Sequence, residues 1–442
     1  MVKPITRQAK SSPVDYRKLL ITNHAQHYTQ AISQVFQTFS IAGAVAEVRV
    51  APRYITVGVV IQSDLQLRKA INLTPEICHR AGLGVGSLEP PITAVLVGGQ
   101  VAYQFSLPEF IQVRNRQVRL WTDLYLSDLE QTSNREQLVV GMGMYHTPTH
   151  FGLTTATPHT LVCGTSGSGK TELLTTITYQ LLSSHTPDEL RLTVIDPKGD
   201  LAERFRDKAH LLWQPAGDQQ DIANLLAHIH QEYLRRRQSN LRHEYKLVLL
   251  MDEADDERIL KDKDNYQKVL DFVQRGRSLN IHLIVGTHRP DQESLGNIGQ
   301  ELTNKYLGKV ANANASGQLQ AGLQLHKLAG RGDFFHVVGE NYLRFQVALT
   351  TAADLDWLPL AAVPLVPIHQ PAQAAISLPI GEHRPAHRPT LQVSGSILAH
   401  YVKLGPENVQ FHQAEQWGLS RRGHELHRKE AIDFLTVYRS VH

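Results

Sequence analysis

The sequence predicts an α/β protein in which helices cover both faces of a parallel β-sheet. A small α+β module is expected before this sheet and a small helical unit after it. Four short runs are almost entirely apolar and are separated by stretches with helical spacing: PHTLVCG, LRLTVIDP, KLVLLMDE and IHLIVGT. Strands buried on both faces have this composition, because polar residues would otherwise face a packed helix.

The N-terminal region is expected to form the α+β module over residues 16–134, after a disordered tail at 1–15. Apolar residues in 16–40 have helical spacing, and so do those of LQLRKAINLTPEICHRAGL. The run AVAEVRVAPRYITVGVVI is rich in Val and Ile and is divided at Ala51-Pro52, so it predicts two strands. ITAVLVGG and VAYQFSL are two further predicted strands.

The α/β domain is predicted over residues 135–358. Residues 359–392 are rich in Pro, Ala and His, which is typical of a linker. Helical spacing returns in residues 393–442, where a basic cluster lies beside a turn at Gly418-Leu-Ser. This C-terminal unit could contact DNA in the manner of a helix-turn-helix, or it could be a helical cap that docks on a protein.

The composition of the 442 residues is that of a globular protein, with 42% apolar and 20% charged residues. A net charge of +3 gives little overall attraction to nucleic acid, so such contacts must come from local patches. Cys78 and Cys163 lie far apart and lack ligand spacing, which argues against a disulfide framework or a zinc site. Neither a membrane span nor an apolar signal region is found, so we expect a cytoplasmic protein without an integral membrane segment.

Residues 164–171, GTSGSGKT, match the phosphate-binding pattern GxxxxGK[ST] in full. The glycines let the loop wrap so that N–H groups face phosphate oxygens, and the next helix adds its positive N-terminal end. Lys170 is expected at the β- and γ-phosphates, and the Thr171 hydroxyl on Mg²⁺. The predicted nucleotide contacts are Gly164, Thr165, Ser166, Gly167, Ser168, Gly169, Lys170, Thr171 and Glu172.

Two acids, Asp252 and Glu253, end the apolar run KLVLLM. Open α/β sheets bind ligands at this carboxyl edge. Asp252 is expected to hold Mg²⁺ directly or through water, and Glu253 to orient and polarise the attacking water. Together with the phosphate loop, these acids predict ATP hydrolysis, with ATP and Mg²⁺ as cofactors.

Polar residues also end the apolar run IHLIVGT. Thr287 and His288 are therefore candidates for sensing the γ-phosphate, and His288 is expected to be a catalytic residue. The alternative is that His288 is only a satisfied surface residue, because histidines at strand ends often are.

Several further stretches occur in the order and at the spacing of a known family's motifs: VIDPKGDLAE at 194–203, His210-Leu-Leu, EYLRRR at 232–237, MDEADD at 251–256, GRSLNIHLIVGTHRP at 276–290 and KLAGRGDFF at 327–335. With the phosphate loop, they resemble the motor of the FtsK/SpoIIIE family of double-stranded DNA translocases. The resemblance covers roughly residues 20–350.

The resemblance implies a RecA-like ATPase that assembles as a hexameric ring around duplex DNA, with hydrolysis sites between subunits. Such sites usually take an arginine from the neighbouring subunit to stabilise charge at the γ-phosphate. Arg277, in the stretch similar to the family's ARA, is the first candidate, and Arg331 is the second. The sequence departs from the family at His288, where the family has glutamine, and it lacks the usual membrane-anchoring segment.

The sequence thus predicts an ATP-driven motor that moves along or pumps double-stranded DNA. Two alternatives stay open: an FtsK-like ATPase for protein export, and a conjugative coupling ATPase that docks on a membrane channel. Export ATPases typically carry tandem ATPase domains and membrane segments, whereas this sequence has a single phosphate loop. A binding module without motor activity is disfavoured, because the phosphate loop, the acid pair and a candidate arginine occur together.

Overall fold

The computed structural model describes the following residues: 16–83, 93–97, 100–113, 116–132, 134–143, 147–239, 244–362, 365 and 368. The chain divides into two compact units, residues 1–376 and 377–442. The expected tail at 1–15 and the helical unit at 393–442 lie outside the described residues, as does most of the expected linker. None of the described helices combines the length and the apolar character that a membrane span requires.

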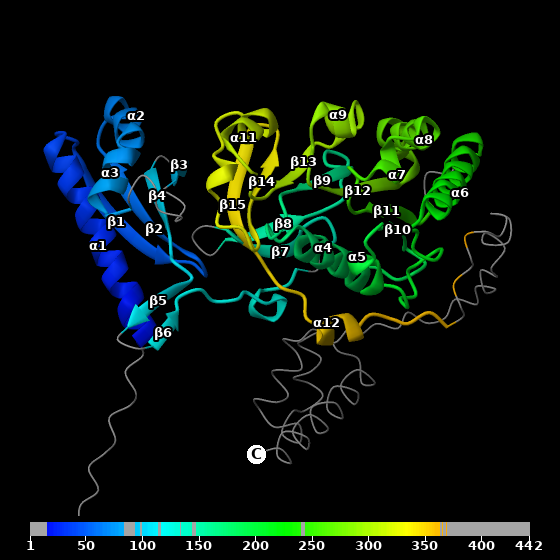
Figure 1. The fold of residues 1–442 in the computed structure, drawn as a ribbon, viewed down its shortest axis with the longest axis horizontal. Coiled ribbons are helices and arrows are strands. Elements are labelled where there is room, and N and C mark those ends of the chain that lie inside the picture. Colours follow the sequence, from blue (N-terminus) through cyan, green and yellow to red (C-terminus); the bar gives the residue numbers. More distant parts are fainter. Residues whose placement is uncertain are drawn as a thin grey trace, which may run out of the picture. The chain divides into compact units, whose positions relative to one another are not determined.

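The N-terminal part of the first unit is built on an antiparallel sheet in the order β1-β2-β4-β3 (Figure 1). Helices α1 and α3 pack on this sheet in one hydrophobic cluster, in which Tyr28 of α1 stacks on Phe105 of β4 with ring centroids 4.1 Å apart. The elements are α1 (Tyr16–Thr38), β1 (Gly43–Val50), β2 (Tyr54–Ile61), α2 (Asp64–Asn72), α3 (Thr74–Arg80), β3 (Thr93–Val97), β4 (Gln100–Ser106) and the hairpin β5 (Phe110–Val113) and β6 (Arg116–Arg119).

The stretch predicted as one helix after β2 is two helices, α2 and α3. The break falls at Leu73, and Pro75 lies in the first turn of α3. Proline has no N–H with which to continue the hydrogen-bond ladder of α2, so α2 has to end before it.

The central sheet has nine strands in the order β10-β11-β12-β9-β13-β14-β15-β7-β8. The four predicted apolar runs are the adjacent parallel strands β10, β11, β12 and β9, and β13 extends them in parallel. The remaining four strands pair antiparallel, so the sheet is mixed rather than purely parallel. Its strands are β7 (Leu138–Gly143), β8 (Pro148–Phe151), β9 (His159–Cys163), β10 (Leu190–Ile195), β11 (Lys246–Met251), β12 (Ile281–Thr287), β13 (Asn304–Leu307), β14 (Asp333–Val338) and β15 (Asn341–Val347).

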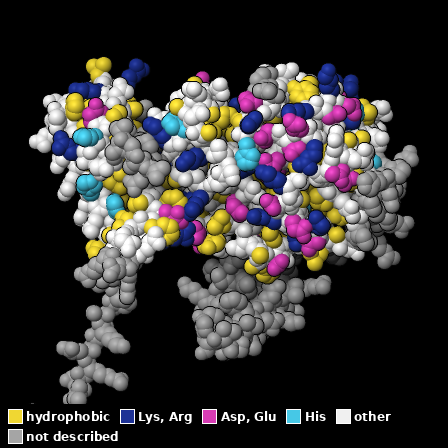
Figure 2. All heavy atoms as spheres, in the orientation of Figure 1, with side chains coloured by type: hydrophobic (Ala, Val, Ile, Leu, Met, Phe, Trp, Pro, Cys, Tyr) yellow, Lys and Arg dark blue, Asp and Glu magenta, His cyan; other side chains and the backbone are white. Residues whose placement is uncertain are grey.

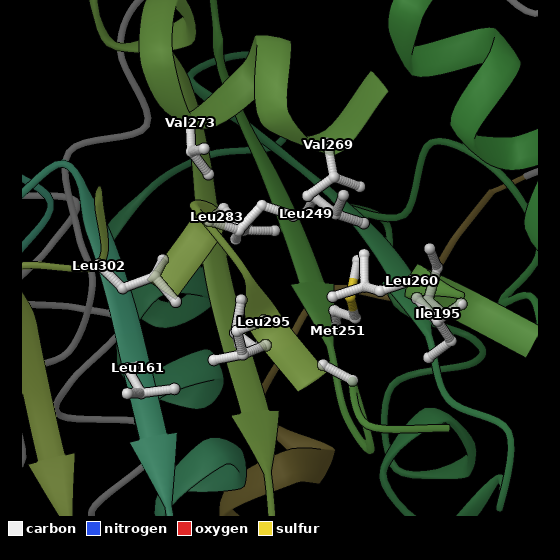
Figure 3. Packing of buried hydrophobic residues seen from close by; sticks show 14 of the residues in the cluster. Leu161, Ile195, Leu249, Met251, Leu260, Val269, Val273, Leu283, Leu295 and Leu302 are labelled. Atoms are coloured by element: carbon white, nitrogen blue, oxygen red, sulfur yellow. The ribbon is translucent and has the colours of Figure 1, made fainter. Parts of the chain in front are cut away.

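Helices cover both faces of the parallel strands, as predicted (Figure 1). Leu249 and Met251 of β11 lie in one hydrophobic cluster with residues of α6, α7 and α8, and Figure 3 shows them beside Val269 of α8 and Leu260 of α7. Val248 and Leu250 pack on the side of α4 and α5. This double packing fixes the carboxyl ends of the strands. The remaining elements are η1 (Leu126–Asp128), α4 (Lys170–Ser184), α5 (Asp200–Glu203), α6 (Gln219–Gln238), α7 (Glu257–Leu260), α8 (Lys263–Arg275), η3 (Gly276–Leu279), α9 (Gln292–Leu295), α10 (Ile298–Glu301), α11 (Ala313–Leu319), η4 (Leu325–Lys327) and α12 (Ala352–Asp356).

Candidate nucleotide-binding site

The phosphate loop connects the carboxyl end of β9 to the first turn of α4. Gly167 and Gly169 have φ values of 77° and 98°, a left-handed conformation that glycine adopts without steric cost. At Gly164, a Cβ would lie 2.5 Å from the Ser168 hydroxyl, so the loop also curls too tightly there for a side chain. The sequence therefore forms the predicted loop because its glycines stand at the positions that need them.

The ends of β9, β10, β11 and β12 meet at a pocket of about 250 Å³. Seven of the nine predicted nucleotide contacts line it, and Gly164 and Ser168 lie behind the loop surface. The complete lining is Thr165, Ser166, Gly167, Gly169, Lys170, Thr171, Glu172, Asp196, Lys198, Asp200, Asp252, Glu253 and His288. The fold thus brings the predicted loop, both acids and His288 to one place.

Lys170 is 4% exposed and lies between the two acids. Its ammonium bonds to Asp252 Oδ1, and it donates to Glu253 Oε1 over 3.1 Å. A buried ammonium is stable only with such partners, because transfer from water is otherwise too costly. A phosphate that enters the pocket therefore has to compete with these two carboxylates for Lys170.

Asp252 is held in place by the neighbouring strand. Its Oδ1 accepts a bond from the Glu253 N–H over 2.9 Å, and a Cβ on Gly286 of β12 would lie only 2.4 Å from that oxygen. Burial raises the pKa of Asp252, against the opposing effect of the Lys170 charge. Asp252 thus occupies space that exists only because position 286 has no side chain.

Glu253 contacts three cationic groups. Besides Lys170, Lys198 donates to its Oε1 over 2.7 Å and His288 Nε2 lies 3.1 Å away. Burial alone would raise the pKa of Glu253, but the hydrogen bonds from His288 and Lys198 and the charge of Lys170 outweigh it and lower the pKa well below its usual range. Glu253 is therefore ionised, as a general base must be, but it is a weak base in this arrangement.

His288 joins the phosphate loop to Glu253. Its Nδ1 lies 2.8 Å from the Gly164 carbonyl oxygen, while its Nε2 faces the Glu253 carboxylate. Both partners are acceptors, so both ring nitrogens can donate only when the imidazole is protonated. The hydrogen bond to Glu253 accordingly raises the pKa of His288. His288, which stands where the family has glutamine, is thus held by two hydrogen bonds, one with the Gly164 carbonyl and one with Glu253.

Asp196, Lys198 and Asp200 line the pocket but were not among the predicted site residues, and Lys198 is the one that contacts Glu253. Lys198 lies just after β10 in the stretch DPKGD, and β10 is the strand next to β11. Lys198 reaches Glu253 because β10 and β11 are neighbours in the sheet, and the sequence does not show which strands are neighbours. A polar residue directly after an apolar strand was the available signal, and Asp252, Glu253 and His288 were predicted from that same signal.

Thr171 and Asp252 form a donor set that suits Mg²⁺. Both line the pocket, and they offer a hydroxyl and a carboxylate. Mg²⁺ takes oxygen ligands and usually keeps several waters besides one or two carboxylates and substrate phosphates. Glu172, the last predicted nucleotide contact, instead pairs through its carboxylate with Arg204 over 2.8 Å.

The two candidate arginines lie in different places. Arg277 is exposed on η3, which directly precedes β12 and so lies at the amino edge of the parallel strands, opposite the pocket. Arg331 lies against the phosphate loop of its own chain, where its N–H donates to the Gly167 carbonyl oxygen over 2.9 Å. The structure therefore brings the backbone of Arg331, but not Arg277, to this chain's phosphate loop, and Arg331 is not among the residues that line the pocket.

Comparisons with known proteins agree with the geometry of the site. Residues 125–295 match the model of the FtsK/SpoIIIE family. DNA translocase FtsK of Bacillus cereus is 23% identical over 371 residues, which cover 77% of this chain and 45% of that protein. DNA translocase FtsK of Mycobacterium tuberculosis is 24% identical over 364 residues, which cover 74% of this chain and 42% of that protein. The chain thus spans less than half the length of these relatives.

Two solved structures are among those that resemble the chain. The cytoplasmic domain of the type VII secretion ATPase EccC of Thermomonospora curvata has a TM-score of 0.48 and 20% identity, and the match covers 56% of this chain and 33% of that one. The pCW3 conjugation coupling protein TcpA, in a monomer form with ATPγS, has a TM-score of 0.47 and 16% identity, over 77% of this chain and 98% of that one.

The family match spans the complete phosphate loop, the acid pair and His288. The curated relatives extend the similarity to about three quarters of the chain. This chain therefore contains a P-loop ATPase domain, and its residues 125–295 resemble the FtsK/SpoIIIE family.

Proposed function

We propose that this chain is an ATP-hydrolysing motor that translocates along or pumps double-stranded DNA as a ring, with six subunits as the proposed assembly. One observation carries the proposal: Lys170 of the phosphate loop lies between Asp252 and Glu253 at the carboxyl edge of the sheet. The curated relatives are named DNA translocases, which supports DNA as the substrate that is moved.

Nucleotide binding begins with the phosphate loop. Its N–H groups and the N-terminal end of α4 attract the phosphates, and Lys170 exchanges its carboxylate partners for phosphate oxygens. Thr171 and Asp252 would hold Mg²⁺. When bound, that ion supplies positive charge where negative charge develops on the phosphates.

Glu253 then becomes a better base. In the present arrangement Lys170, Lys198 and His288 all face its carboxylate and lower its pKa. When phosphate draws Lys170 away, one of these cations is lost and the pKa of Glu253 rises toward its usual value. The carboxylate then accepts a hydrogen bond from the attacking water more strongly. Binding of the nucleotide thereby prepares the group that hydrolyses it.

His288 is proposed to report the state of the γ-phosphate. It contacts Glu253 on one side and the carbonyl of Gly164, the first residue of the phosphate loop, on the other. A shift of either group changes both hydrogen bonds. His288 can therefore couple the position of the loop to that of the base.

The proposed ring would complete the site with an arginine from the neighbouring subunit. Head-to-tail contacts bring different surfaces of neighbouring subunits together, so the pocket of one can meet the amino edge of the next. Arg277 is exposed on that edge and is the proposed arginine. It would stabilise the charge that develops on the γ-phosphate.

DNA would be held through its phosphates rather than through its bases, as a motor that moves along any sequence requires. On the face shown in Figure 2, Lys and Arg side chains are intermingled with Asp and Glu side chains, in keeping with the net charge of +3. Contacts with DNA are therefore proposed to come from a few local groups and from the C-terminal unit at 393–442. The alternative role for that unit is docking on a protein.

The proposal is tested by the ATPase rate of the purified protein with and without linear duplex DNA, with Lys170→Ala as the blank. Strong stimulation by duplex and weaker stimulation by single strands is the expected result, and triplex displacement would then measure translocation directly. Turnover above the blank that duplex does not stimulate would contradict a simple DNA motor.

A further inference from the structure

The loop at residues 329–333 connects the N-terminal module to the phosphate loop. It lies between η4 and β14 and contains the sequence GRGD. Gly330, Arg331 and Gly332 have φ values of 78°, 51° and 94°. Three left-handed residues in succession, one of them not glycine, persist only where the surroundings hold them.

One side of this loop is hydrogen-bonded to the phosphate loop. The N–H groups of Arg331 and Gly332 donate to the carbonyls of Gly167 and Ser168 over 2.9 and 2.6 Å. The two loops also touch, because a Cβ on Gly169 would lie 2.4 Å from the Gly332 nitrogen. A peptide group is planar, so a fixed carbonyl also fixes the N–H on its other side. The loop at 329–333 therefore sets the direction of phosphate-loop N–H groups.

The other side of the loop is held by Arg53, from the turn between β1 and β2. Its guanidinium donates to the Gly330 carbonyl oxygen over 3.0 Å and stacks over Trp121, 4.9 Å from the ring centroid. Arg53 is 5% exposed, and burial lowers its pKa to about 10, which leaves it charged at neutral pH. A buried cation on a carbonyl is a strong, directional contact.

Arg331 adds a second contact between the same parts of the chain. Its guanidinium pairs with Glu109, which precedes β5, over 2.5 Å and lies 5.8 Å from the Trp121 ring centroid. The Arg331 side chain is exposed, so this pair contributes less than the buried Arg53 contact. The ends of the loop are fixed independently, because Asp333 binds Arg344 and accepts a bond from the Ala329 N–H.

We propose that Arg53 is a positioning residue for the nucleotide site: through the Gly330 carbonyl it orients the loop at 329–333, which holds the phosphate loop in its phosphate-binding conformation. The N-terminal module is then part of the ATP site although none of its described residues lines the pocket. This inference rests on ATP binding at the phosphate loop, as in the proposed function, and is independent of DNA.

The test compares Arg53→Gln with Arg53→Lys and with the control Tyr103→Phe. Tyr103 also donates a buried side-chain bond to a backbone carbonyl, that of Ala70, but both partners lie within the module. Three quantities are measured: the Kd of a fluorescent ATP analogue, KM and kcat for ATP, and the thermal unfolding midpoint. Hydrogen exchange of the peptides that contain 164–171 and 329–333 is followed in parallel.

We expect Arg53→Gln to raise Kd and KM about tenfold, the effect of one strong hydrogen bond, with kcat at saturating ATP nearly unchanged. Exchange should quicken in both peptides. Arg53→Lys, which keeps the charge and a donor, should restore part of the affinity. Tyr103→Phe should lower the unfolding midpoint and leave Kd unchanged.

The inference is wrong if Arg53→Gln binds the analogue as tightly as Tyr103→Phe does. Should Arg53→Gln fail to fold, Arg53→Lys alone carries the test, and wild-type affinity in that variant together with wild-type exchange would refute the proposal. The two proposals can fail separately. If duplex DNA does not stimulate the wild-type ATPase rate but Arg53→Gln still weakens binding of the ATP analogue, the DNA motor is overturned and this inference stands.

Discussion

The two edges of the parallel strands differ in how their cations are paired. At the carboxyl edge, Lys170, Lys198 and His288 all contact Glu253. At the amino edge, Arg277 is exposed, and its side chain makes no hydrogen bond or ion pair with another of the residues that the structure describes. The cations at the carboxyl edge therefore pair with a carboxylate of the same chain, whereas Arg277 at the amino edge points to solvent.

The exposed position of Arg277 does not come from a loosely held segment. Arg236 of α6 is fully buried, pairs with Glu232 over 2.7 Å and donates to the Leu279 carbonyl at the end of η3 over 2.9 Å. The short helix that carries Arg277 is thus fixed from beneath. A rigid support and an outward cation are what a site completed by a neighbouring subunit requires.

Loss of Lys170 should have the largest effect on the carboxyl edge. Lys170→Ala removes the cation that exchanges between carboxylates and phosphate, and we expect turnover to fall by about 1,000-fold or more. A coupled hydrolysis assay measures the loss of turnover, and calorimetric titration with ATP measures the loss of binding. Turnover above a tenth of the wild-type rate would mean that the pocket is not the hydrolytic site.

Glu253→Gln should separate hydrolysis from binding. The amide cannot accept a proton from water, so we expect kcat to fall about 100- to 1,000-fold while ATP affinity is retained. Asp200→Asn, another acid that lines the pocket, is the matched control and should change kcat little. Equal losses in both variants would remove Glu253 from the role of general base.

Arg277→Ala tests the amino edge. We expect kcat to fall about 100-fold with ATP affinity retained, and Arg275→Ala, which truncates a neighbouring exposed arginine, to change it little. Mixing Arg277→Ala with Lys170→Ala should restore part of the activity, because some sites then combine an intact pocket with an intact arginine of the neighbour. No recovery in mixed assemblies that are shown to form would exclude Arg277 as the shared residue.

The smallest effect concerns the His288–Glu253 pair. The pKa of His288 is raised in the folded protein, so its contribution to stability is complete at low pH and is lost as pH rises through that raised pKa. We expect the wild type to exceed His288→Gln in unfolding free energy by about 1 kcal/mol or less near pH 6, and the two to converge by about pH 9. Urea titrations at several pH values measure this difference, and a constant gap would contradict the ionic pairing.

The parallel strands and most of the site were predictable because they are local patterns. The phosphate loop, Asp252, Glu253 and His288 each follow a short apolar run, and their meeting at one edge follows from parallel pairing. Lys198 was not predicted, because its role depends on which strand lies beside β11.

The antiparallel half of the sheet was missed for a related reason. β7 and β8 precede β9 in the sequence but pair at the far end of the sheet, next to β15. That pairing joins residues far apart in the sequence, as the pairing of Gly141 with Val347 shows. No short stretch of sequence encodes a pairing over that separation.

The missing side chain at Gly286 has a consequence for attempts to redesign this domain. A methyl group there would lie 2.4 Å from Asp252 Oδ1 and 2.7 Å from a methyl carbon of Leu174 in α4. The hydrophobic core and the chemistry meet at this one point, so neither can be varied alone. A combinatorial library could exchange the adjacent Ile284 and Val285 for residues of similar volume, but it must keep position 286 constant to retain a working enzyme.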